Sequence, residues 1–395
     1  MEKIKWKSPN TVTGPVAKGK NFFERQQIVE DIWYELENGS FILLAAPRRV
    51  GKTSIMTFLA SKPKEGYKLI FRNVQGISSE KDFYKTIYEL IINCLSKSNQ
   101  FKKWVEIHLK SRSISEVDIN GKLKLTNIEL DYLAEINDII PKIESDGEIV
   151  VLFIDELPEL LFNLHKNNQS EDASRILKNL RRWRQEEQFE KLRFVLAGSI
   201  GIHYVVNTIE GRNSDLNDLK EVTCLPIEDT ETDKYFDWAT NNSTVQYNPE
   251  LRAYLLSKIQ YFVPYFINLM LNEIDNVARK RNNPTISKTD IDAAFASILN
   301  NNDFFADWKK RLSNYMPPAD YIFVNEILTH IAHRESLTIQ QIYDIAAKHD
   351  KMTDFMDFID NLKKDGYIIN RNNVYVFISP FIKEFWKLKN PIYNV

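Results

Sequence analysis

The hydrophobic positions in the first half of the chain form short apolar runs separated by segments with helical periodicity. The apolar runs are residues 41–45, 68–73, 148–154, 192–197 and 221–225. The run at 148–154 is continuous rather than alternating, which is typical of a parallel strand covered on both faces. Because helical segments stand between the runs, the sequence predicts an α/β fold with a parallel sheet.

The segments outside the strands show other patterns. Residues 1–20 predict an extended arm. Between the second and third strands, residues from about 80 to 145 predict a mostly helical insert with a polar segment near 111–124. Strand signals stop after about residue 228, so 228–302 predicts a helical bundle. The segment 303–395 predicts three helices followed by a hairpin near 370–373, which is the order of a winged helix. The expected domains are 1–20, a core at 21–227, 228–302 and 303–395.

One segment between the first strand and the next helix carries candidate chemistry. Ala46–Thr53 (APRRVGKT) approaches the phosphate-loop pattern G-x-x-x-x-G-K-[ST]. Its backbone N–H groups would cradle phosphates, Lys52 would reach the β- and γ-phosphates, and Thr53 would offer its hydroxyl to Mg²⁺. The expected nucleotide contacts are Ala46, Pro47, Arg48, Arg49, Val50, Gly51, Lys52, Thr53 and Ser54. The alternative is a chance GKT turn.

This loop departs from the pattern at its first position, where Ala46 replaces glycine. A methyl group is acceptable there if the residue does not need a positive φ. Gly51, by contrast, keeps the glycine that permits close approach of the backbone to a phosphate.

An acidic pair follows the buried strand at 148–154. Asp155 would hold Mg²⁺, and Glu156 would orient and polarise an attacking water. Phosphoryl transfer needs mainly positioning and charge stabilisation, so these two carboxylates complete a minimal ATPase site. The alternative is an acidic helix N-terminus, where carboxylates are favourable.

Further polar candidates lie near the remaining strands. Ser199 follows the strand at 192–197 and could contact the γ-phosphate or the attacking water, unless it marks a simple turn. Arg212 stands in a loop before the last strand and could act as an arginine finger. Helical spacing places most of Arg175, Arg181, Arg182 and Arg184 on a solvated face.

Composition narrows the class of protein. Lys and Arg total 52 and Asp and Glu total 54, so no general basic field attracts nucleic acid or a membrane surface. The two cysteines, Cys94 and Cys224, are far apart, which favours a reducing compartment over a disulfide framework. Without an apolar leader or a run of about 18 apolar residues, a cytoplasmic location is expected.

Together these residues resemble the AAA+/STAND group of P-loop ATPases, specifically the archaeal-type ATPase family that also occurs in bacteria. Ala46–Thr53 resembles its Walker A motif, Val150–Glu156 its Walker B motif and Leu196–Ser199 its sensor. Phe22–Arg25 resembles the F-x-G-R-E box, with Glu24 in place of glycine, and Phe262–Pro264 resembles the lid motif G-x-P, with Phe262 in place of glycine. The end at Asp365–Trp386 is similar to the family's winged helix.

The resemblance implies a five-stranded parallel sheet, a helical lid at 228–302, and ATP with Mg²⁺ as ligands. It also implies nucleotide contacts from Arg25 and Pro264 and homo-oligomer formation on ATP binding.

Three functions remain open at this point. The leading hypothesis is an ATP-hydrolysing regulatory switch that acts on a protein partner. The second is a DNA-associated ATPase regulator of a mobile element or a defence system, using the winged helix. Its candidate recognition helix, 353–365, holds four aspartates against two lysines, and the hairpin adds only Arg371, so DNA binding is less favoured. The third is a nucleotide-bound scaffold that does not turn over.

Overall fold

The computed structural model describes residues 5–95, 114–117, 123–125, 130–143, 148–198, 201–301 and 304–391. These residues divide into two compact units. The first unit combines 1–23, 46–54 and 224–395, and the second combines 24–45 and 55–223. The phosphate-loop segment 46–54 therefore groups with the C-terminal helices, although both its chain neighbours belong to the second unit.

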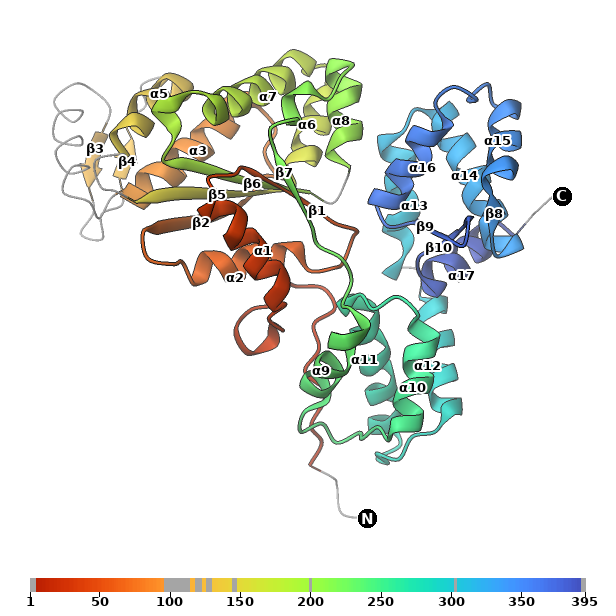
Figure 1. The fold of residues 1–395 in the computed structure, drawn as a ribbon. Coiled ribbons are helices and arrows are strands. Elements are labelled where there is room, and N and C mark those ends of the chain that lie inside the picture. Colours follow the sequence, from red (N-terminus) through yellow and green to blue (C-terminus); the bar gives the residue numbers. More distant parts are fainter. Residues whose placement is uncertain are drawn as a thin grey trace. The chain divides into compact units, whose positions relative to one another are not determined.

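The second unit contains the predicted parallel sheet (Figure 1). Its strands lie in the order β2-β5-β6-β1-β7, and each pair of neighbours is parallel. The bounds are β1 Ile42–Ala45, β2 Tyr67–Asn73, β5 Ile149–Asp155, β6 Leu192–Ala197 and β7 Lys220–Thr223. All five predicted strands are confirmed; β7 ends two residues earlier than expected, at Thr223.

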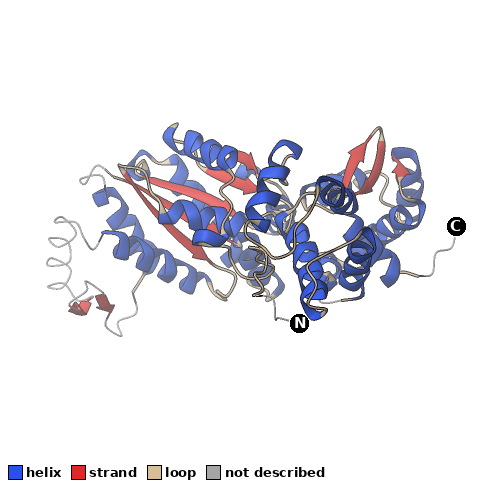
Figure 2. Ribbon diagram, turned by 90° about the horizontal axis from the view of Figure 1, so that it is seen from below, coloured by secondary structure: helices blue, strands red, loops and turns tan. Residues whose placement is uncertain are grey.

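Helices cover both faces of this sheet. Figure 1 shows α1 and α2 on one face and α3, α6 and α7 on the other, and Figure 2 shows the central strands running side by side between helices. The central strand β5 is buried from Val150 to Asp155, which explains its unbroken apolar run. The helices are α1 Gln26–Glu37, α2 Lys52–Ser61, α3 Glu80–Leu95, α5 Tyr132–Ile143, α6 Leu157–Lys166, α7 Ser170–Gln185 and α8 Ile202–Glu210. Short 3-10 turns lie at Gly19–Asn21, Glu187–Phe189 and Ser214–Leu216.

The insert between β2 and β5 differs from its prediction. It contains α3 and α5 as expected, but it also holds an antiparallel pair of strands, β3 Ile114–Val117 and β4 Leu123–Leu125. These strands fall in the polar segment, which has no clear strand period in the sequence. Such short pairs depend on cross-strand contacts that local periodicity does not report.

The first unit is mainly helical. Its bundle contains α9 Asp229–Thr240, α10 Pro249–Ile259, α11 Pro264–Lys280 and α12 Lys288–Asn300. In the C-terminal part, the described residues 304–391 form five helices where the sequence predicted three: α13 Ala306–Tyr315, α14 Pro318–Arg334, α15 Ile339–Lys348, α16 Phe355–Lys364 and α17 Pro380–Lys389. A three-stranded sheet in the order β8-β10-β9 joins them, formed by Leu337–Thr338, Val374–Phe377 and Ile368–Arg371.

The N-terminal arm is extended and is held by the helical bundle. Trp6 Nε1 donates to Asp275 Oδ1 at 2.9 Å, and Ser8 Oγ donates to Asp275 Oδ2 at 2.7 Å. At its other end the arm reaches the phosphate-loop segment, where the Ala17 N–H donates to Ser54 Oγ at 3.0 Å. The arm thus links α11 to the first turn of α2 within the first unit. In the part of the chain that the structure describes, no helix is long and apolar enough to span a membrane.

Candidate functional site

Four strands of the sheet bring their carboxyl ends to one level. Asp155 at the end of β5 pairs with Asn73, and Ile154 one residue earlier pairs with Leu196 of β6. Ala197 of β6 pairs in turn with Leu44 of β1. The phosphate loop begins two residues after Leu44. It therefore leaves the sheet at the edge where Asp155 ends its strand.

The backbone of the loop explains the pattern of glycines. Gly51 has φ +100° and Arg49 has φ +67°, whereas Ala46 does not have a positive φ. An L side chain at Gly51 would be strained, but the methyl group of Ala46 adds no such strain. The missing first glycine is therefore compatible with this loop conformation.

Lys52 is the first residue of α2, and its side chain turns back over the loop. It is 6% exposed, and its Nζ donates to the carbonyl oxygens of Ala46 at 2.8 Å and Pro47 at 3.3 Å. The ammonium group is thus held inside the curve of the loop, where a phosphate-binding lysine is required.

The two arginines of the loop contact helices of the first unit. The Arg48 guanidinium lies 5.9 Å from the Trp308 ring centroid and 3.7 Å from Asp307 Oδ2, both on α13. The Arg49 guanidinium lies 4.6 Å from the ring centroid of Tyr265, the second residue of α11. The sequence did not predict Asp307, Trp308 and Tyr265 as site residues. Their hydrophobic periodicity indicates only that they belong to helices, not that these helices contact the loop.

Pro47 of the loop packs closely on a turn of the C-terminal part. A Cβ on Gly366 would lie 2.5 Å from Pro47 Cβ, and Gly366 has φ +77°. Only glycine fits both the conformation and the space at this position.

Two arginines of the loop carry buried guanidinium N–H groups. Burial, with the nearby charges of Arg311 and Arg49, lowers the pKa of Arg48 to about 10. Arg48 Nη1 and Arg49 Nε are buried and make no hydrogen bond within the described part of the chain. A buried donor without an acceptor is costly, so these N–H groups suit an anionic ligand with several oxygens.

The acidic pair lies at the junction of β5 and α6. Asp155 is fully buried, and its Oδ1 accepts from the Glu156 N–H at 3.1 Å. Glu156 precedes α6 and has φ +61°, a left-handed conformation that is uncommon outside glycine. This conformation lets the chain turn sharply from β5 into α6. Strained backbone of this kind is common at functional sites.

The turn after β6 packs on this junction. A Cβ on Gly198 would overlap Cδ and Cγ of Pro158, which is the second residue of α6. The ends of the two neighbouring strands β5 and β6 are therefore in tight contact just beyond the sheet. The sensor candidate Ser199 lies outside the described residues.

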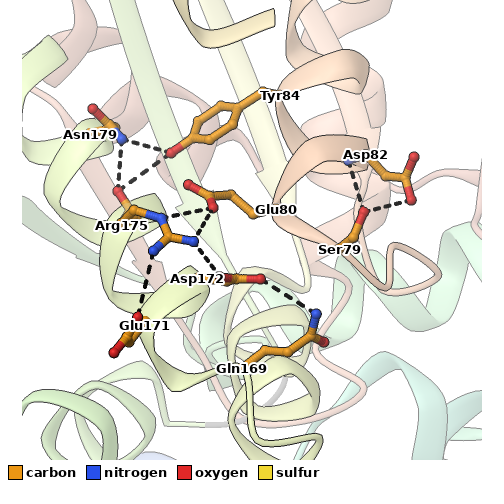
Figure 3. Close-up of polar contacts among 9 residues, drawn as sticks. All are labelled: Ser79, Glu80, Asp82, Tyr84, Gln169, Glu171, Asp172, Arg175 and Asn179. Carbon is orange, nitrogen blue, oxygen red and sulfur yellow. Dashed lines mark hydrogen bonds and ion pairs between the residues drawn. The ribbon is translucent and has the colours of Figure 1, made fainter. Parts of the chain in front are cut away.

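Arg175 forms a cluster of ion pairs between α7 and α3 (Figure 3). Its Nη2 lies 2.7 Å from Glu80 at the start of α3, and it also pairs with Asp172 and Glu171 of its own helix. The hydrogen bond to Glu80 raises the pKa of Arg175. In Figure 3, Asn179 donates to Tyr84 of α3, at 2.8 Å. This cluster fastens α7 to α3.

The side chains of Arg175, Arg182 and Arg181 are 51%, 40% and 36% exposed, as predicted for a solvated face of α7, and only Arg184 departs from that prediction. The Arg184 side chain is 1% exposed and pairs with Asp218 at 2.8 Å, and Arg181 pairs with the buried Asp215 at 3.1 Å. Both arginines hold the segment before β7, because α7 packs beside it. Arg212, by contrast, is exposed in the bend after α8.

The other predicted contacts lie at helix starts. Arg25 immediately precedes α1 and is 6% exposed, and Pro264 is the first residue of α11, next to Tyr265. Among the described residues no group of three or more His, Cys, Asp or Glu is arranged to hold a metal. One carboxylate and one hydroxyl suit Mg²⁺, which usually takes its other ligands from phosphates and water.

Comparisons with known proteins agree with this topology. No protein-family model and no curated protein sequence matches the chain. Among solved structures, a Walker-type ATPase of Pyrococcus abyssi superposes with a TM-score of 0.56 at 16% identity, covering 95% of this chain and 98% of that one. The chain shares the fold of this Walker-type ATPase, a five-stranded parallel sheet with helices on both faces. The ORC2 protein of Aeropyrum pernix, in its ADPNP–ADP complexes, gives a TM-score of 0.49 at 11% identity, with 98% of each chain covered.

Proposed function

We propose that this protein binds ATP with Mg²⁺ at Ala46–Ser54, hydrolyses it, and uses the nucleotide state as a switch that acts on a protein partner. The observation that carries the proposal is the double role of the loop. Its lysine turns inward over the loop carbonyls, while its two arginines contact α13 and α11. A phosphate that competes for those arginines would change the contacts of the loop with these two helices.

Each proposed ligand follows from a residue's chemistry. Lys52 and the loop N–H groups bind the phosphates, and Arg48 and Arg49 supply further positive charge. Thr53 and Asp155 hold Mg²⁺ with hard oxygen ligands. Arg25 and Pro264 flank the nucleotide.

Hydrolysis in this proposal depends on Glu156. Its carboxylate orients a water for attack on the γ-phosphate, and Ser199 assists at the end of the neighbouring strand. Arg212, exposed after α8, is the proposed finger toward a second copy in an ATP-dependent oligomer. Transition-state charge in phosphoryl transfer is spread over oxygens, so an added guanidinium is effective.

The C-terminal part is the proposed output module. Its helices α14–α16 and the sheet β8-β10-β9 have the element order of a winged helix. Within α16, Asp357 and Asp360 balance Lys363 and Lys364, and Lys363 is paired with Asp360 at 3.1 Å. Such a helix offers phosphates little attraction, so we favour a protein partner over DNA. We place this activity in the cytoplasm, consistent with two cysteines that form no disulfide with each other.

The test is nucleotide binding and hydrolysis by Lys52→Ala. We expect ATP affinity to fall about tenfold or more and Mg²⁺-dependent hydrolysis to disappear, because the ammonium group contacts both terminal phosphates. Lys62→Ala is the matched control, since Lys62 is an exposed lysine just beyond the same helix, over the Phe58 ring. Unchanged binding and turnover in Lys52→Ala would refute the proposal.

A further inference from the structure

The C-terminal helices carry an exposed apolar surface that the nucleotide site does not use. Its members are Ile339 and Tyr343 on α15, Met352 in the following turn, and Met356 on α16, with exposures of 42%, 39%, 45% and 39%. We call these four residues the Met–Tyr surface. Side chains of this size are normally covered when several of them gather in one place.

Tyr343 links exposed side chains of α15 to those of the following turn and α16. The Tyr343 hydroxyl lies 3.5 Å from Met352 Sδ, and its ring meets the Phe355 ring edge-on at 5.7 Å between centroids. Ile339 lies one turn before Tyr343 on α15, so it extends this contact along the helix. Met356 is the second residue of α16 and is also exposed. The contacts of Tyr343 with Met352 and Phe355 therefore connect α15 to the start of α16.

The Met–Tyr surface is not the core-facing side of these helices. The buried face of α15 is formed by Ile342, Ile345 and Ala346, and that of α16 by Phe358, Ile359 and Leu362. Both helices thus bury one apolar face inside the module and present further apolar residues outside. A helix that only needs to fold would place polar residues at these outer positions.

Acidic residues outnumber basic residues in the segment that carries the patch. Residues 339–365 contain six aspartates and four lysines, and Asp344 and Asp357 directly adjoin Tyr343 and Met356. Three of the lysines are drawn into ion pairs of the module: Lys351 with Asp320 at 2.6 Å, Lys363 with Asp360 at 3.1 Å, and Lys348 with Glu326 at 3.9 Å. The field around the patch is therefore negative, which is unfavourable for nucleic acid.

We propose that the Met–Tyr surface is the docking site for a partner protein's amphipathic helix with lysine or arginine beside its apolar face. Two methionines and a tyrosine give an adaptable apolar contact, as at other surfaces that bind helices. The aspartates complement the partner's basic residues and fix its orientation. The inference names the class of protein that the proposed ATP-dependent switch would bind. It rests on the proposed function only for the statement that ATP regulates this binding.

The experiment measures binding of fluorescent peptides to the full chain without nucleotide. The probes are an amphipathic helical peptide of about 18 residues made of Leu and Lys, the same peptide with Glu in place of Lys, and a scrambled Leu–Lys peptide. We expect the Leu–Lys helix to bind at least about tenfold more tightly than either control peptide, with an affinity that falls as salt rises.

Variants then locate the site. Met352→Ser/Met356→Ser should weaken the Leu–Lys helix about tenfold, because two apolar side chains leave the contact. Leu388→Ser removes another exposed apolar side chain, on α17, and should leave binding within about twofold. Lys52→Ala should bind the peptide normally, so a failed docking site and a failed nucleotide site give different results.

Three outcomes would overturn the inference. The first is equal binding of the Glu and Lys peptides, or equal loss in the Met and Leu388 variants, which would mean unspecific apolar adhesion. The second is tight binding of a DNA duplex that Met352→Ser/Met356→Ser weakens. The third is a dimer of the full chain that the double variant dissociates, since a second copy would then occupy the surface.

Discussion

The Arg49 guanidinium of the phosphate loop lies over the ring of Tyr265, 4.6 Å from its centroid. Arg49 has a positive φ and Tyr265 follows the first residue of α11. A ring face attracts a cation, and burial raises the pKa of Tyr265, so its hydroxyl stays neutral. The contact gives the loop a direct connection to a helix far along the chain.

Tyr265→Ala should uncouple α11 from the nucleotide while leaving ATP affinity within about threefold. A cation–π contact of this kind contributes about 0.5–2 kcal/mol, enough to bias a switch without abolishing binding. The measurement is the ATP-induced change in hydrogen exchange of residues 264–280. Tyr265→Phe keeps the ring and should behave as wild type. A full ATP response in Tyr265→Ala would remove this contact from the switch.

Glu156→Gln should retain ATP binding and lose hydrolysis by about 100-fold or more. The amide keeps the shape of the side chain but cannot take up a proton from water. Glu159→Gln, one turn into the same helix, is the control. If the Glu156→Gln variant turned over ATP at the wild-type rate, another residue would have to activate the water. A switch trapped in its ATP state by this substitution would exclude the scaffold hypothesis.

Gly198→Ala should impair hydrolysis more than it impairs folding. The new Cβ would overlap the Pro158 ring, and a proline cannot rotate away, so the start of α6 with Glu156 must shift. Overpacking of this type costs about 1–3 kcal/mol. Gly76→Ala is the matched control, because its Cβ meets nothing within 4 Å. Melting temperature and turnover are measured together, and normal turnover in Gly198→Ala would contradict the expectation.

The Arg184–Asp218 pair predicts an acid-sensitive contribution to stability. Burial alone would raise the pKa of Asp218, but the hydrogen bond and charge of Arg184 outweigh it and hold that pKa below its ordinary value of 3.8. A depressed pKa stabilises the folded state above the unfolded pKa, and this contribution is lost as pH falls through the folded value. Asp218→Asn should therefore be less stable than wild type at pH 7, by about 1–3 kcal/mol, with the difference shrinking below pH of about 4.

Arg175 provides the control for that measurement. Its side chain is 51% exposed, and its pairs with Glu80 and Asp172 are screened by solvent. Arg175→Ala should cost about 1 kcal/mol or less and leave turnover unchanged. Denaturant unfolding over pH 2.5–7 compares the two variants. An Asp218→Asn deficit that stayed constant down to pH 2.5 would show that the carboxylate is not the stabilising group.

The sequence by itself determined the sheet and the positions of two motifs at the ends of its strands. The inner strands β1, β5 and β6 are continuous or nearly continuous apolar runs, because both of their faces are covered. The edge strands β2 and β7 also carry polar residues, and Lys220, Glu221 and Thr223 of β7 are exposed. The phosphate loop and the Asp155–Glu156 pair are local motifs placed directly after strands, so their positions followed from the strands themselves.

Only the tertiary structure decided which residues these motifs contact. Trp308 and Tyr265 have ordinary helical spacing, and their place beside Arg48 and Arg49 depends on packing between segments more than 200 residues apart. Arg184 likewise looked like a surface residue until α7 packed against the segment at Asp218. Periodicity reports which face of a helix is apolar, but not which distant segment covers the polar one, because that choice is made by long-range packing.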